Sequence, residues 1–152
     1  MKRFGIVVVV GLLVVGACAD HAQDKGYWRA ASSQANSITG DIAISTTRVT
    51  INFTSFLIAQ VRQLTTAEIG AVFAADVNAG GSGDLYRVNV PAEKRFLHHN
   101  TLCGTDEAEW MATYVSGRSL WVAFFSGSTP PRLTLDAMND ATNVCGVFTY
   151  GR

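Results

Sequence analysis

The sequence predicts a mostly β domain, built as a small antiparallel barrel or sandwich of about seven or eight strands with one short helix. Three observations lead to this prediction. Short segments alternate between apolar and polar residues with a period of two, as half-buried strands do. Turn-forming residues separate these segments at short intervals. Helical spacing with a start signal is found in one segment, near residues 66–76.

The folded part is expected to begin at Tyr27, and the first hairpin is expected around residues 45–47. Residues 38–44 place apolar side chains at even positions, and residues 49–53 place them at odd positions. The change of parity across 45–47 is what a hairpin or a sharp bend requires. Alternation continues over residues 57–62, which predicts a further strand.

The expected helix starts at a capping box. Thr65 and Glu68 have the spacing in which the threonine side chain and the glutamate side chain each satisfy a backbone amide of the first turn. Apolar residues follow at helical intervals, which predicts a helix near residues 66–76. One more strand in this segment is the alternative. Residues 80–83, Gly-Gly-Ser-Gly, predict a flexible loop.

Strands are also expected in the second half of the chain. Residues 84–90 alternate, with Tyr86, Val88 and Val90 on the predicted buried face. A further alternating set, Trp110, Ala112 and Tyr114, predicts the next strand.

A turn signal at residues 116–119 leads into residues 120–125, which are apolar on both faces. A strand of this kind is central or covered on both sides. Residues 126–143 contain Pro130 and Pro131 and predict a long surface connection. The last strand is expected over residues 144–150.

The first residues are typical of an export signal. Lys2 and Arg3 precede an uncharged segment, residues 5–17, that would span about 20 Å as a helix. A bilayer core of about 30 Å needs about 20 residues, so this segment is short for a transmembrane helix and fits a secretory signal.

The end of this segment resembles the signal of bacterial lipoproteins, with Val15, Gly16 and Ala17 before Cys18. The resemblance implies that residues 1–17 are removed and that Cys18 is acylated at the new N-terminus. It also implies a place in the cell envelope, facing the periplasm, and, because Asp is not at position 19, the outer membrane. An ordinary secretory signal, with Cys18 incidental, is the alternative.

This division leaves residues 18–26 as a lipidated cysteine with a polar tether and residues 27–152 as a single β-rich domain. Without Lys2 and Arg3, ten basic side chains remain of twelve, against twelve acidic ones. A slightly acidic domain without a basic patch is a poor nucleic-acid binder, so no nucleic-acid partner is expected.

With Cys18 assigned to lipid, Cys103 and Cys145 remain. A pair of cysteines in an exported chain predicts a disulfide bond. A metal site and a nucleophilic thiol are the alternatives, but neither cysteine has a Cys-x-x-Cys partner or a histidine at ligand spacing.

No catalytic or metal-binding residue and no cofactor motif is predicted. His98 and His99 are neighbours on the chain and would point to opposite faces of a strand, so they are poorly placed to share a metal. Asp106, Glu107 and Glu109 could supply paired carboxylates to an envelope hydrolase with these histidines, if a cleft brought them together. Solvation of a turn is the simpler interpretation of this acidic run.

Residues 82–86, Ser-Gly-Asp-Leu-Tyr, resemble the Ser-Gly-x-x-Tyr motif of membrane-bound inhibitors of c-type lysozyme. That resemblance implies a small β-barrel lipoprotein that inserts a serine loop and a lysine-bearing loop into the lysozyme cleft. It makes Ser82, Gly83, Tyr86 and Lys94 a candidate binding loop. The second motif of the family is absent, since Arg95 follows Lys94 where the family has glycine.

Longer pieces resemble a group of uncharacterised alphaproteobacterial exported proteins, which bring no activity with them. These pieces are residues 38–42, 85–88, 100–104 and 145–150. The expected function is therefore that of a non-enzymatic lipoprotein whose disulfide-bonded β-domain supports the envelope or binds a protein partner there. Lysozyme inhibition and envelope hydrolysis are the alternatives.

Overall fold

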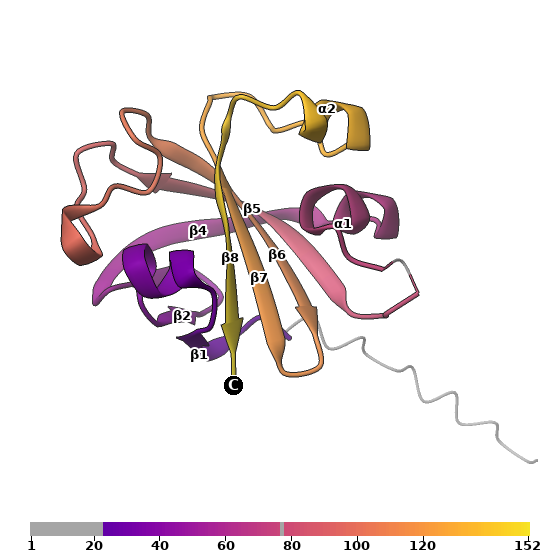
Figure 1. Ribbon diagram of the computed structural model, residues 1–152, viewed down its shortest axis with the longest axis horizontal. Helices are drawn as coiled ribbons and strands as arrows, with labels where there is room; N and C mark the ends of the chain where they lie inside the picture. The colour runs from indigo at the N-terminus through magenta and orange to yellow at the C-terminus, as the bar shows by residue number, and fades with distance from the viewer. Residues whose placement is uncertain (1–22, 77) are drawn as a thin grey trace, which may run out of the picture.

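The computed structural model describes residues 23–76 and 78–152 and arranges eight strands in one closed antiparallel barrel (Figure 1). Each strand pairs with the next along the chain, and β8 pairs with β1, so every strand in the barrel has two neighbours. The predicted fold class is confirmed, in its barrel form. The strands are β1 (Gly26–Ala30), β2 (Ile42–Ile44), β3 (Arg48–Ile51), β4 (Thr54–Gln63), β5 (Ser82–Val90), β6 (Ala108–Ser116), β7 (Ser119–Phe125) and β8 (Val144–Gly151).

Helical segments fill the connections. The helix α1 (Thr66–Phe73) confirms the predicted helix, and the capping box between Thr65 and Glu68 is formed in both directions. The helix α2 (Leu135–Asn139) lies within the expected long connection and contacts α1. Two short turns, η1 (Ala35–Thr39) of π type and η2 (Leu97–His99) of 3₁₀ type, complete the set.

The strand expected from residue 38 begins later, at Ile42, because η1 occupies Ala35–Thr39. Ala35 and Thr39 are fully buried, and the Thr39 hydroxyl lies 2.7 Å from that of Tyr150. The period-two pattern at Ile38 was therefore misleading, since residues 35, 38 and 39 also share one face of a helical turn. Gly40 then reverses the chain with φ of 61°.

Two loop boundaries also differ from expectation. Phe53 is part of the turn between β3 and β4, where Asn52 and Phe53 have φ of 45° and 65°. This is the conformation of a tight hairpin turn, which phenylalanine does not signal in a sequence. Ser82 and Gly83, expected in a flexible loop, instead begin β5.

The barrel interior is filled by large side chains. Tyr86, Val88 and Val90 point inward from β5 as predicted, and each is 2% exposed or less. The largest fully buried members of the whole core are Trp28, Tyr86, Tyr150, Phe124, Phe125 and Phe148. A second apolar layer covers the outside of β5–β8. In this layer Phe73 of α1 stacks on Tyr114 and Tyr114 stacks on Trp121, and Phe125 and Leu133 belong to the same cluster. The prediction that β7 is covered on both faces is therefore confirmed.

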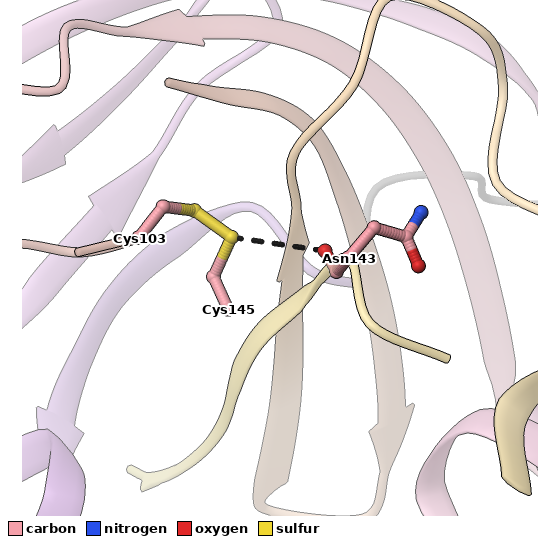
Figure 2. Close-up of a disulfide and its surroundings, with 3 residues drawn as sticks. All are labelled: Cys103, Asn143 and Cys145. Atoms are coloured by element: carbon pink, nitrogen blue, oxygen red, sulfur yellow. Dashed lines mark hydrogen bonds between the residues drawn. A yellow bond between two sulfur atoms is a disulfide. The ribbon is translucent and has the colours of Figure 1, made fainter. Parts of the chain in front are cut away.

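The disulfide bond between Cys103 and Cys145 is present, as predicted (Figure 2). It joins the β5–β6 connection to the start of β8, with 4.6 Å between the two Cα atoms. Cys145 Sγ lies 3.9 Å from the Asn143 carbonyl oxygen. Closing a loop of 42 residues stabilises the fold by about 4 kcal/mol through the entropy of the unfolded chain.

The folded part begins before Tyr27, the expected first residue. Gly26 belongs to β1, and the side chain of Asp24 is almost fully buried. The end of the expected tether is thus part of the barrel, since its backbone and its carboxylate are paired there. The predicted signal at residues 1–17 and the predicted lipid site at Cys18 lie outside the described residues. Within 23–76 and 78–152, no helix has the length and apolar content to cross a bilayer.

Candidate functional site

The residues of the predicted binding loop are not brought together. Ser82 begins β5 and is partly exposed, whereas Tyr86, four residues further, is 0% exposed inside the barrel. Gly83 is buried, and a Cβ atom built there would lie 2.5 Å from the Thr113 carbonyl oxygen. Lys94 lies beyond the far end of β5, with its ammonium 5.9 Å from the centre of the Phe96 ring. The serine and the lysine are therefore at opposite ends of the barrel.

Tyr86 instead belongs to a buried polar cluster at one end of the barrel. Its hydroxyl donates to Asp24 Oδ2 at 2.6 Å and accepts from Lys25 Nζ at 2.6 Å. Thr113 of β6 donates to the same Asp24 oxygen at 3.0 Å. Burial raises the pKa of Tyr86, and the hydrogen bond to Asp24 and the charges of Asp24 and Asp84 raise it further. The phenol therefore stays neutral and acts as a hydrogen-bonding group.

The main chain around Asp24 is also held. The indole of Trp28 donates to the Asp24 carbonyl oxygen at 2.9 Å, and Arg152 donates to the carbonyl oxygens of Gln23 and Lys25 at 3.2 Å each. Asp24 Oδ1 lies 3.2 Å from Lys25 Nζ, an ion-pair distance, but the direction is poor and this oxygen accepts no hydrogen bond. We call this end, which holds residues 23–25, the N-terminal mouth of the barrel.

The residues considered for hydrolysis are exposed or are paired with other residues. His98 and His99 are exposed on η2, and both have positive φ. Asp106 and Glu107 are exposed, while Glu109 pairs with Arg87 at 2.8 Å on the outside of the barrel. No hydrogen bond or ion pair joins these carboxylates to the histidines in the described part of the chain, which also contains no cluster of histidine, cysteine and acidic residues able to hold a metal ion.

A groove of about 350 Å³ lies on the outer face of β1–β3, and it is the candidate binding site. Large apolar side chains and small residues line it together. Phe53 is 99% exposed and Tyr27 is 58% exposed. Leu97 is a third large apolar residue of the lining, and its small residues are Ala30, Gly40, Ala43 and Thr50.

Hydrogen bonds to Asp41 hold Tyr27 in place beside the groove. The Tyr27 hydroxyl donates to Asp41, whose other oxygen accepts from the Ala30 amide at 2.8 Å. The hydrogen bond from Tyr27, followed by that from Ala30, lowers the pKa of Asp41, so the carboxylate is charged at neutral pH. At Gly40, a Cβ atom would lie 3.1 Å from a methyl group of Leu97, so glycine at this position leaves room for the Leu97 side chain.

Phe53 is the residue that the sequence did not single out. Its odd parity with Val49 and Ile51 assigned it to a buried strand face, whereas the turn turns it outward. The Asn-Phe pair between two alternating segments was the available signal, because asparagine is common at the positive-φ positions of tight turns.

No protein-family model matches this sequence, and neither a curated protein nor a solved structure matches it. The functional argument therefore rests on the geometry of the barrel, the groove and the N-terminal mouth.

Proposed function

We propose that this chain is a lipid-anchored envelope protein without enzymatic activity, whose disulfide-bonded barrel binds a protein partner through the groove between Tyr27, Phe53 and Leu97. The observation behind this proposal is the 99% exposure of Phe53 in a left-handed turn. A large aromatic side chain in water is unfavourable by burial arithmetic, and a non-glycine residue in this conformation is strained by about 1–3 kcal/mol. Such strain together with such exposure favours a contact that the isolated domain lacks.

The groove fits an apolar side chain presented by another protein. Small residues in its lining leave space, and Tyr27, Phe53 and Leu97 supply apolar contact surface. Asp41 and Asn36 on its border supply polar groups for the rim of an interface. A central aromatic contact with a polar surround is the usual arrangement of a binding hot spot.

The filled interior supports an outer site. An eight-stranded barrel can hold a small ligand when its interior side chains leave room. Here Trp28, Phe124 and Phe148 occupy the interior and are 1% exposed or less. A barrel that carries an apolar ligand inside is thus a weaker interpretation of this chain than one that binds a partner on its surface.

The anchor belongs to the proposal through the resemblance at residues 15–18. A disulfide between Cys103 and Cys145 is consistent with an oxidising compartment outside the cytoplasm. Metabolic labelling with palmitate tests this part. We expect label in the wild type and none in Cys18→Ser, and equal labelling of the two would contradict the anchor.

The groove is tested by photo-crosslinking in cells. A photoreactive phenylalanine analogue at position 53 is expected to form a discrete adduct with an envelope protein. The same analogue at position 135 is the matched control, because Leu135 is also exposed, at 62%, but lies on α2 away from the groove.

Phe53→Ser should reduce the abundance of the native complex at least tenfold, and Leu135→Ser should leave it unchanged. Identical adducts from positions 53 and 135, or no adduct from position 53, would reject the groove as the binding site.

A further inference from the structure

The N-terminal mouth of the barrel carries three exposed arginines, and the chain enters the fold there. Arg152 holds Gln23 and Lys25, and its amide donates to the carbonyl oxygen of Arg118 at 3.1 Å. Arg118 is at the turn between β6 and β7, which lies near the C-terminus in Figure 1. These contacts place Arg118 and Arg152 next to the point where residue 23 emerges.

Arg48 lies at the same end. Gly26 at the start of β1 pairs with Ile44, and Ile44 pairs with Val49. Arg48 is one residue beyond this row, after the turn between β2 and β3, and it is exposed. Among the residues that the structure describes, no Asp or Glu carboxylate lies at ion-pair distance from the side chains of Arg48, Arg118 and Arg152. The Arg118 guanidinium instead donates to the main-chain oxygen of Arg152.

The carboxylates at this end are mostly engaged. Asp24 pairs with Lys25, and Glu68 pairs with Arg62. Asp84 is buried and accepts from Gln60 at 2.7 Å, and Asp76 is exposed on the connection after α1. Three arginines outside any ion pair of the described residues, against the two carboxylates of Asp76 and Asp84, leave this end positive.

The opposite end has the opposite balance. The connections 91–107 and 126–143 together carry five acidic residues and three basic ones. The acidic residues are Glu93, Asp106, Glu107, Asp136 and Asp140, and the basic ones are Lys94, Arg95 and Arg132. The barrel therefore has a charge asymmetry along its axis, which orients it in the field of a charged surface.

We infer that the N-terminal mouth docks on the headgroups of anionic phospholipids through Arg48, Arg118 and Arg152. This inference rests on the lipid anchor of the proposed function. Four residues lie between Cys18 and Gln23, so the five steps from one Cα to the other reach at most about 18 Å when fully extended. Because Gln23 and Asp24 are bonded to the barrel, an acylated Cys18 would keep this end near the membrane, and anionic lipid complements its charge. The groove at Phe53 is on the side of the barrel, so it stays accessible in this orientation.

The test uses the lipoprotein purified from its host and reconstituted into vesicles, with amide hydrogen exchange as the readout. On vesicles that contain one third phosphatidylglycerol, we expect exchange in the turns at residues 45–47 and 116–118 to be about tenfold slower than on pure phosphatidylcholine. High salt should remove this difference, because the contact is electrostatic. The turn at residues 52–53 serves as the internal reference.

The double variant Arg48→Gln/Arg118→Gln should lose the difference between the two lipids. The matched control, Arg95→Gln/Arg132→Gln, removes the same charge from exposed positions at the other end and should keep it. Arg152 is left unchanged because it packs 4.1 Å from the Trp28 ring and holds the N-terminal segment. If the double variant fails to fold, the wild type alone still tests docking, because high salt should abolish its difference in exchange between the two lipids.

The experiment distinguishes an incorrect anchor from incorrect docking. A protein without an acyl mass that does not float with vesicles overturns the anchor, and docking with it. A protein that floats but whose turns exchange equally on both lipids overturns docking alone. Protection that is equal on both lipids and insensitive to salt also overturns it.

Discussion

At the scale of the residue, Asp24 shows how one buried charge organises the start of the fold. Its carboxylate receives hydrogen bonds from Tyr86 and Thr113, on two different strands, and lies next to Lys25. A charge this deeply buried is tolerated only with such partners. The same residue sets the point from which the chain leaves the barrel toward Cys18, so its effect reaches the orientation of the whole molecule.

Asp24→Ala should lower the free energy of unfolding by about 3 kcal/mol, because it leaves the Tyr86 and Thr113 hydroxyls buried without their acceptor and removes the ion-pair partner of Lys25. Urea denaturation followed by tryptophan fluorescence measures this loss. Asp106→Ala is the matched control: this carboxylate is exposed, and its removal should change the free energy by less than about 0.5 kcal/mol. A similar loss in the two variants would contradict the role of Asp24.

The buried Tyr150 should make the stability of the fold depend on pH in the alkaline range. Burial raises its pKa, and the charge of Asp41 adds to this, against the lowering effect of the bond to Thr39. The unfolded tyrosine releases its proton near pH 10, while the folded one keeps it. Above that pH the unfolded state binds fewer protons, so stability is complete below pH 10 and falls as pH rises beyond it.

Tyr150→Phe should be less stable than the wild type at pH 8 by about 1 kcal/mol, because it loses the bond to Thr39. Its stability should decline less steeply between pH 10 and pH 11.5. Urea midpoints across this range test the prediction, and parallel curves for the two proteins would contradict it.

At the scale of the element, α1 begins at the capping box that its sequence contains. Thr65 accepts from the Glu68 amide at 3.2 Å, and Glu68 accepts from the Thr65 amide at 2.9 Å. Arg62 adds a two-pronged ion pair to the same glutamate and is the main reason that the pKa of Glu68 is lowered. Ile69 and Val72 then face the outer apolar layer. Local capping and apolar spacing agree here, so the prediction held.

Thr65→Ala should destabilise the domain by about 1 kcal/mol, because the capping hydroxyl is lost. Thr66→Ala is the matched control at the next position, where the exposed side chain caps nothing. Thermal unfolding monitored by circular dichroism compares the two. An equal loss in both variants would show that the cap contributes little.

At the scale of the whole molecule, closure decides stability. The pairing of β1 with β8 and the disulfide between Cys103 and Cys145 both join β8 to earlier segments of the chain. The disulfide acts at the end of the barrel opposite the N-terminal mouth, where the long connections meet. The two ends are thus held by different means, one by a covalent bond and the other by a buried polar cluster.

The double variant Cys103→Ser/Cys145→Ser should lose about 4 kcal/mol of unfolding free energy relative to the oxidised wild type. Urea denaturation with and without a reductant measures this difference. The reductant should bring the wild type close to the variant and should not affect the variant itself. A variant as stable as the oxidised wild type would contradict the stabilising role of the bond.

The sequence by itself determined the strands, the start of α1 and the disulfide pair. Period-two alternation follows from the geometry of one strand, and a capping box follows from one turn, so each can be inferred from residues close together in the chain. The lipid anchor and the export signal are also local patterns, and they stay predictions for residues outside the described part.

Only the tertiary structure decided that the sheet closes, that Tyr86 points inward to meet Asp24, and that Phe53 stands in solvent beside a groove. These outcomes depend on contacts between residues far apart in sequence, such as the bond from Thr113 to Asp24 across 89 positions. For the same reason, the residues of the candidate binding loop, Ser82, Gly83, Tyr86 and Lys94, are not brought together on one surface. A sequence motif shows which side chains are present, but strand pairing sets the direction in which each one points. In β5 that pairing places Tyr86 inside the barrel.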